Sequence, residues 1–364
     1  MANYAENQAS QKTKVNPMDL TFNIIFVPGM VHYLRLAIQS LLKFSPYQFR
    51  LVSNGVRGEE WLRLKQFCDQ HDRLTFYDAS TPNMIPHGTL LTRLWQQERG
   101  EHFCFMDPDI FATLPFHEPL EEHLSECDVF SSCQTLSVDP DETWIGFQGR
   151  CTRAPTGQAL ATTFFAVYRN EPLRQVIAAG GVGFERYVNL ESIPDPVRQY
   201  LVKQGIDAPR YDTAKVLNLF MHSHGLRFKY KSLEGLHHIG GMASHFANSS
   251  EKKTITAIAR RWLRSRFSLC DRDFEILPDP HSDPDAPTTN RLWLTVEEFR
   301  RCKRASKCRQ QLAIFFSAYL KSLFDGAPEP RLEISDQLLR ERICKTCDAI
   351  RSLYEEHDRL QTAA

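Results

Sequence analysis

The sequence has no long hydrophobic run and no excess of charge of either sign. Its 364 residues carry 44 basic and 44 acidic side chains, so no overall field attracts nucleic acid and any anionic ligand must be held by local groups. Residues 1–20 lack the apolar core of a signal peptide, and no segment approaches the run of about 18 apolar residues that spans a membrane. We therefore expect a soluble, cytoplasmic protein that does not bind nucleic acid.

A disulfide framework and a zinc-type spacing are also lacking. Ten cysteines are scattered along the chain, several of them in apolar runs where a free thiol behaves as a small hydrophobic group. Cys344 and Cys347 form one close pair, but no second pair at zinc-site spacing accompanies it, so we expect the two to pack on one helix face. P-loop and dinucleotide-binding fingerprints are absent as well, which argues against an ATPase or a dehydrogenase.

Short apolar runs alternate with segments of helical periodicity through the first part of the chain. This alternation predicts right-handed crossovers and the α/β class, with a doubly wound, mostly parallel sheet that has helices on both faces. The predicted strands are 22–27, 49–52, 74–77, 103–106, 160–168 and 228–230, and the predicted helices include 33–42, 59–71, 90–95 and 211–225.

The character of the chain changes at about residue 250, where the sequence becomes basic and helical. We divide the chain into a polar, flexible N-terminus (1–20), an α/β domain (21–249) and a mainly helical C-terminal region (250–364). Segment 252–267 combines apolar residues with several arginines. A basic amphipathic helix of this kind either packs against the main domain or makes peripheral contact with an anionic membrane surface.

Two carboxylates follow the predicted strand 103–106. Pro108 favours extended backbone at Asp107, and the period of two then turns Asp107 and Asp109 to the same side. Carboxylates that face one point repel each other unless a cation lies between them, and Mg²⁺ or Mn²⁺ commonly joins such carboxylates to substrate phosphates. The same tripeptide recurs at 139–141 and 283–285, where a turn or loop-capping role is the preferred interpretation. Only the first copy follows a strand, which favours a metal site there.

The ordered motifs of residues 20–245 resemble the nucleotide-sugar-dependent glycosyltransferases of the GT-A fold. The tripeptide 107–109 looks like that family's Asp-x-Asp motif. The segment 237–241, His-His-Ile-Gly-Gly, lies about 130 residues later and looks like the histidine-and-glycine segment that often completes the metal site. The resemblance implies a metal-dependent glycosyltransferase of the hexosyltransferase type with a nucleoside-diphosphate sugar as donor, a UDP-sugar being favoured.

The resemblance also implies a set of metal ligands for a divalent cation, Mn²⁺ or Mg²⁺. Asp109 is the candidate for direct ligation, and Asp107 is expected to reach the metal through water or to contact the ribose. His238 or His237 would add a nitrogen ligand. Adjacent histidines on a strand point to opposite faces, so one of the two is expected to face the metal.

Donor contacts are expected at the ends of the first two predicted strands, because ligands of such sheets bind at the carboxyl ends of strands. Small residues there let the backbone approach a base or ribose closely, although ordinary turn chemistry explains them equally well. The segment before the third predicted helix also resembles a donor-contacting segment. The candidate donor-binding residues are Val27, Pro28, Gly29, Asn54, His87, Gly88 and Asp107.

For the acceptor side, Asp212 is the candidate general base. Its competing and preferred role is that of a helix N-cap, because it precedes an apolar helical segment. Trp144 and Phe147 are candidates for stacking against the acceptor, with core packing as the alternative. Whether the sugar is transferred with inversion or retention stays open.

Of three alternatives to a glycosyltransferase, one fits the same motifs and two lack a sequence feature that they require. A non-catalytic nucleotide-sugar-binding or scaffold protein fits the same motifs and differs only in forming no product. A sugar nucleotidyltransferase would carry a glycine-rich phosphate loop after the first strand, and that loop is missing. A haloacid-dehalogenase-type phosphatase would carry Thr or Val where Phe111 stands.

Overall fold

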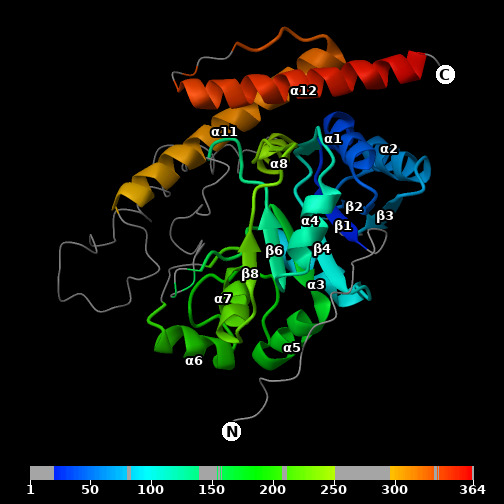
Figure 1. Ribbon diagram of the computed structural model, residues 1–364. Helices are drawn as coiled ribbons and strands as arrows, with labels where there is room; N and C mark the ends of the chain where they lie inside the picture. Colours follow the sequence, from blue (N-terminus) through cyan, green and yellow to red (C-terminus); the bar gives the residue numbers. More distant parts are fainter. Residues whose placement is uncertain are drawn as a thin grey trace.

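The chain folds around one central sheet with helices on both faces, and two long helices near the C-terminus lie across one side (Figure 1). This arrangement confirms the predicted α/β class and the helical character of the C-terminal region. The computed structural model describes residues 20–79, 83–138, 154, 156, 158–206, 211–250, 296–331, 334 and 336–362.

The main sheet has seven strands in the order β3-β2-β1-β4-β7-β6-β8. The first four strands of the chain are parallel, whereas β7 runs antiparallel to both of its neighbours, β4 and β6. The strands are β1 (Thr21–Phe26), β2 (Gln48–Ser53), β3 (Leu74–Asp78), β4 (His102–Met106), β5 (Ile110–Ala112), β6 (Val129–Ser132), β7 (Phe165–Arg169), β8 (Phe228–Tyr230) and β9 (Leu236–His238).

The order of the strands reverses between β1 and β4. The chain runs outward from β1 through β2 to β3 and then returns to the opposite side of β1 as β4. Such a reversal leaves a crevice outside the carboxyl ends of the two central strands, where ligands of open α/β sheets bind. Residues 27–29 follow β1 at this place, and residues 107–109 follow β4.

Two hydrophobic clusters cover the two faces of the sheet. The alternation along β1 places Phe22, Ile24 and Phe26 in one cluster and Ile25 in the other, as a strand buried on both faces requires. Helices α1 (Val31–Phe44), α2 (Gly58–Asp69), α4 (His117–Leu124), α8 (Met242–Ser250), α11 (Val296–Asp325) and α12 (Gln337–Thr362) pack in the first cluster. Helices α3 (His87–Gln97), α5 (Asn170–Gly180), α6 (Asp195–Lys203) and α7 (Lys215–Ser223) pack in the second.

The C-terminal helices share their buried side chains with the sheet domain. Phe316 and Tyr319 of α11 and Ile343 of α12 belong to the same cluster as the β1 side chains. At the surface, the hydroxyl of Tyr33 in α1 donates a hydrogen bond of 2.7 Å to Asp325 at the end of α11. The two regions are therefore continuous through one core, and the division at residue 249 remains a prediction.

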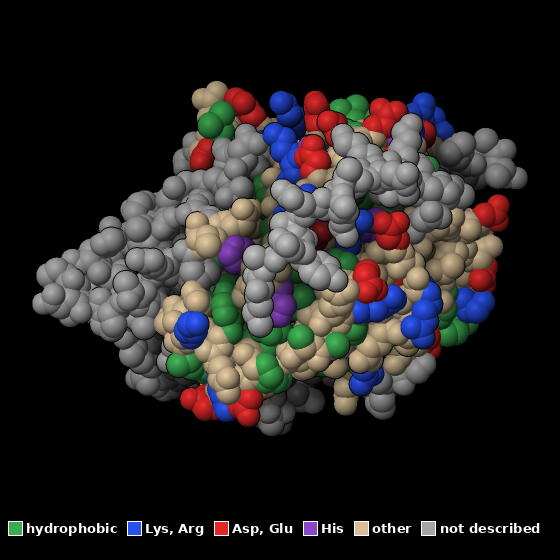
Figure 2. Space-filling model, turned by 60° about the horizontal axis from the view of Figure 1, so that its bottom comes forward, with side chains coloured by type: hydrophobic (Ala, Val, Ile, Leu, Met, Phe, Trp, Pro, Cys, Tyr) green, Lys and Arg blue, Asp and Glu red, His purple; other side chains and the backbone are tan. Residues whose placement is uncertain are grey.

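The surface carries charges of both signs, as the balanced composition requires. On the face shown in Figure 2, basic and acidic side chains of the described residues are interspersed. Within the described part of the chain, none of the helices has both the length and the apolarity needed to cross a bilayer. The proposed membrane-contacting segment 252–267 lies outside the described residues.

Candidate metal centre

The two aspartates are positioned by the end of β4 and the start of β5. The backbone N–H of Asp107 donates to the carbonyl of Phe164, at 2.7 Å, next to the start of β7. Asp109 directly precedes β5, which pairs antiparallel with β9 in a separate two-stranded sheet, and Ile110 lies opposite His238 in that pairing. The small sheet thus places two segments beside each other that are more than a hundred residues apart in sequence.

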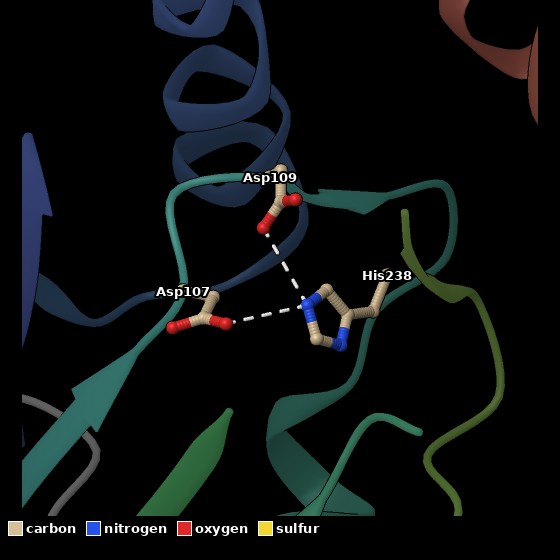
Figure 3. A group of neighbouring side chains, drawn as sticks. All are labelled: Asp107, Asp109 and His238. Atoms are coloured by element: carbon tan, nitrogen blue, oxygen red, sulfur yellow. Dashed lines mark ion pairs between the residues drawn. The ribbon is translucent and has the colours of Figure 1, made fainter. Parts of the chain in front are cut away.

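Asp107, Asp109 and His238 converge on one point (Figure 3). The Nε2 atom of His238 lies 3.4 Å from Oδ2 of Asp107 and 3.5 Å from Oδ1 of Asp109. One ligand atom from each of the three side chains lies within 4.8 Å of the others. The side chain of His238 is 0% exposed and that of Asp109 is 2% exposed, whereas that of Asp107 is 26% exposed, so the group opens to solvent on the Asp107 side.

Backbone groups fix the two buried members of this triad. Nδ1 of His238 lies 2.8 Å from the carbonyl oxygen of Cys133, to which it donates, so Nε2 is the nitrogen that faces the carboxylates. Oδ2 of Asp109 accepts a hydrogen bond of 3.1 Å from the backbone N–H of Met242, the first residue of α8. The other oxygen of Asp109 is left to face His238.

The electrostatics of the triad follow from its burial and its charges. Burial lowers the pKa of His238, but the carboxylates of Asp107 and Asp109 outweigh it and raise that pKa to about 10. Burial raises the pKa of Asp109, yet the interactions with His238 and with the N–H of Met242 more than offset it, and the pKa is lowered. A positive charge at this point is therefore strongly favoured.

The residues of the triad fit a divalent cation. Nε2 of His238 is buried and forms no hydrogen bond with any residue that the structure describes. Its distances to the two carboxylates are longer than the roughly 2.7–3.2 Å of ordinary N–H···O bonds. Two carboxylate oxygens and one imidazole nitrogen form a donor set typical of protein-bound divalent metals. Backbone hydrogen bonds orient His238 and Asp109, as is usual for metal ligands.

His237 lies on the opposite face of β9. Its Nε2 atom is 3.2 Å from the hydroxyl oxygen of Thr113, and its Nδ1 atom is 3.1 Å from that of Thr346 in α12. Adjacent histidines therefore do point to opposite sides, and the structure brings only His238 to the two aspartates. Of the two candidates, His238 is the one we retain as a predicted ligand.

His87 lies within electrostatic range of both Asp107 and Asp212. Burial lowers the pKa of His87, and the two charges that oppose this shift are those of Asp107 and Asp212. One imidazole therefore interacts with carboxylates from two separate elements. Asp212 comes from the turn before α7, where its Oδ1 atom accepts a hydrogen bond of 3.0 Å from the N–H of Thr213.

The alternative role of Asp212 as a helix cap is not what the structure shows. The N-cap of α7 is Ala214, with φ of 62°, and no side chain caps the helix. The predicted helix 211–225 thus begins later, at Lys215, because the chain first makes a tight turn. Asp212 therefore does not occupy the N-cap of α7, and its catalytic role remains a prediction.

Several of the strand-end residues predicted to bind the donor make hydrogen bonds or close packing contacts within the protein. Gly29, with φ of 89°, donates its N–H to both carboxylate oxygens of Glu60 at 2.9 Å. The side-chain amide of Asn54 donates a hydrogen bond of 2.9 Å to the carbonyl oxygen of Ile85, and its Oδ1 atom accepts one of 2.8 Å from the N–H of the same residue. A Cβ atom on Gly88 would lie 2.2 Å from the carbonyl oxygen of Phe184, so packing requires a glycine there.

These contacts explain the presence of Gly29, Asn54 and Gly88 by the needs of the fold. Contact between these residues and the donor stays a prediction. Val27 and Pro28 lie at the same end of β1 as Gly29. Trp144 and Phe147, the predicted acceptor contacts, lie outside the described residues. The sequence analysis did not predict the contact between Glu60 and Gly29, because acidic residues are common in the first turn of a helix.

Comparisons with known proteins add similar structures but no sequence relative. No protein-family model matches the sequence, and no curated protein matches it. The structure is similar to the mannosyltransferase PcManGT from Pyrobaculum calidifontis in complex with GDP-Man and Mn²⁺, with 11% identity, a TM-score of 0.39 and coverage of 96% of this chain and 86% of that one. TarS 1-349 from S. aureus in complex with UDP is 14% identical, with a TM-score of 0.38 and coverage of 93% and 91%.

A third similar structure is the galactosyltransferase LgtC in complex with donor and acceptor sugar analogues. It is 10% identical, with a TM-score of 0.34 and coverage of 79% of this chain and 96% of that one. Likenesses at these TM-scores carry no argument about activity. The functional conclusion therefore depends on the geometry of the chain's own residues.

Proposed function

We propose that the chain is a metal-dependent glycosyltransferase that moves a sugar from a nucleoside-diphosphate sugar to an acceptor. One observation carries the proposal: Asp107, Asp109 and His238 converge, within 4.8 Å, outside the carboxyl end of β4. That position lies at the switch point of the sheet, where ligands bind. The exposed side of the triad, at Asp107, gives a substrate access to it.

The chemistry of the site follows from the roles of its side chains. A bound divalent cation would stabilise the negative charge that develops on a departing nucleoside diphosphate. Asp109 and His238 would hold the cation from the buried side, where Met242 and Cys133 fix their orientation. Asp107, the exposed member, would reach the cation or the donor's ribose.

The donor and acceptor fall on the exposed side of the triad. We place the nucleotide, for which uridine is our first choice, along the ends of β1 and β2. The charges of Asp107 and Asp212 both act on His87, and we assign Asp212 to the acceptor, whose hydroxyl proton it would accept. A carboxylate suits that task because its oxygens can accept a proton from a hydroxyl group.

Calorimetric titration of the purified protein with UDP-, GDP-, CMP- and dTDP-sugars, in Mn²⁺ or in EDTA, tests the proposal. We expect one nucleotide class to bind in Mn²⁺ and to lose its affinity in EDTA. An affinity that is the same in EDTA as in Mn²⁺, or no binding at all, would contradict a metal-dependent transferase. Release of the nucleoside diphosphate in the presence of an acceptor then separates an enzyme from a non-catalytic nucleotide-sugar-binding protein.

A further inference from the structure

The side chain of Arg309 in α11 packs directly on the two glycines that follow the metal-site histidine. Gly240 and Gly241 both have positive φ, 81° and 88°. A Cβ atom on Gly240 would lie 3.3 Å from Cδ of Arg309, and one on Gly241 would lie 3.4 Å from Cγ. The positive φ favours glycine at both positions, and at Gly240 a Cβ atom would also lie 2.3 Å from Cγ2 of Thr135. The stem of Arg309 lies against this stretch of backbone.

The order of these contacts gives the direction in which the arginine runs. Cγ lies opposite Gly241 and Cδ lies opposite Gly240, so the stem runs back along the chain toward His238. The nearest neighbour of Gly240 is Thr135, which itself pairs with His238. The aliphatic stem of Arg309 therefore lies against the residues that directly follow His238 and pair with it.

The charges of the proposed substrate call for a cation at this place. Asp107 and Asp109 together carry two negative charges, which a divalent cation balances. A nucleoside diphosphate adds at least two more negative charges, and the balanced composition of the chain supplies no general positive field to meet them. A guanidinium pairs with phosphate oxygens through two parallel hydrogen bonds, which makes arginine well suited to a diphosphate.

We propose that Arg309 binds the diphosphate of the donor beside the metal, so that α11 of the C-terminal region completes the active site. This inference rests on the proposed function. The glycine pair offers the aliphatic stem of Arg309 a backbone surface to lie on, directly after the metal-site histidine. Packing of α11 on the glycines without any ligand contact is the competing account.

The variant Arg309→Met separates these two accounts, because methionine keeps most of the apolar stem and removes the charge. The matched control is Lys307→Met, which removes an exposed cation of the same helix. The full-length protein is titrated calorimetrically with UDP in the presence of Mn²⁺, or with GDP where the wild-type protein prefers it. Titration with Mn²⁺ alone and thermal unfolding report on the metal site and the fold.

We expect Arg309→Met to weaken nucleoside-diphosphate binding by about tenfold or more, since one charge-assisted pair is lost. Affinity for Mn²⁺ alone should stay unchanged, and Lys307→Met should bind as the wild type does. Arg309→Lys should give an intermediate affinity. Wild-type diphosphate affinity in both Arg309 variants would overturn the role of Arg309 alone, whereas a wild-type protein that binds no nucleoside diphosphate would overturn the proposed function and this inference with it.

Discussion

The Nδ1 atom of His238 donates a hydrogen bond of 2.8 Å to the carbonyl oxygen of Cys133, and this contact turns the opposite ring nitrogen toward the two aspartates. Cys133 has a positive φ of 62°, so the backbone turns sharply where its carbonyl meets the ring. A histidine orientated from behind in this way presents its Nε2 atom in one direction only. The imidazole is thus placed before any ligand arrives.

Replacing His238 by glutamine should lower the affinity for Mn²⁺ by more than about 100-fold, because even the loss of a group behind a metal ligand costs about 10–100-fold. Its neighbour supplies the control. His237→Gln should leave Mn²⁺ affinity unchanged, since that ring contacts Thr113 and Thr346 on the other face of β9. Calorimetric titration of both variants with Mn²⁺ measures these affinities. An equal loss of Mn²⁺ affinity in the two variants would contradict the assignment of His238 as a metal ligand.

Asp109→Asn should also abolish most of the Mn²⁺ affinity while keeping α8 in place. An asparagine oxygen still accepts the N–H of Met242, but the negative charge that faces the cation is gone. We expect a loss of more than about 100-fold in a Mn²⁺ titration. The thermal midpoint of the metal-free protein should also fall, because the buried imidazole of His238 loses one of its two carboxylate partners. The control Asp69→Asn removes an exposed carboxylate of α2 and should bind Mn²⁺ normally; the interpretation fails if Asp109→Asn does so too.

The first four strands could be predicted from the sequence because their apolar runs end at turn residues. The runs predicted at 22–27, 49–52, 74–77 and 103–106 correspond to β1 through β4, with shifts of one residue at most ends. β6, with the sequence Val-Phe-Ser-Ser, is too short and too polar for this signal, and the prediction missed it. The antiparallel direction of β7 depends on which strands it pairs with, and hydrophobic periodicity does not report pairing.

The candidate site shows the same division between local and non-local information. Asp107 and Asp109 were visible because they follow a strand at a spacing of two. The choice between His237 and His238 depended on β5 and α12, whose positions relative to β9 no local pattern contains. The groups that orient the triad, at Cys133 and Met242, are backbone atoms, and a backbone contact leaves no mark on residue type.

Asp212→Asn should slow turnover strongly without weakening the fold. A general base contributes about 100- to 10,000-fold to a rate, so we expect a loss in that range, with unchanged affinity for the donor. An asparagine oxygen can still accept the hydrogen bond from the N–H of Thr213, so we expect little change in the free energy of unfolding. Steady-state kinetics and thermal unfolding measure the two effects. Asp195→Asn, at the exposed start of α6, is the control and should retain full turnover.

The shared core predicts that the C-terminal helices unfold together with the sheet. Ile343 of α12 is fully buried in the cluster that covers one face of the sheet, so Ile343→Ala should lower the free energy of unfolding by about 2–5 kcal/mol. Leu338→Ala on the same helix, at a side chain that is 71% exposed, should change it by less than about 0.5 kcal/mol.

Urea denaturation followed by far-ultraviolet circular dichroism and by tryptophan fluorescence tests whether this loss is felt globally. In one cooperative unit both signals shift together in Ile343→Ala, since a cavity in a common core weakens everything packed around it. A separate early transition, seen in the circular dichroism alone, would instead mark the C-terminal helices as an independent unit and support a domain boundary near residue 249. That outcome would also weaken the case for Arg309, because an arginine on a helix that detaches first cannot be held rigidly against Gly240 and Gly241.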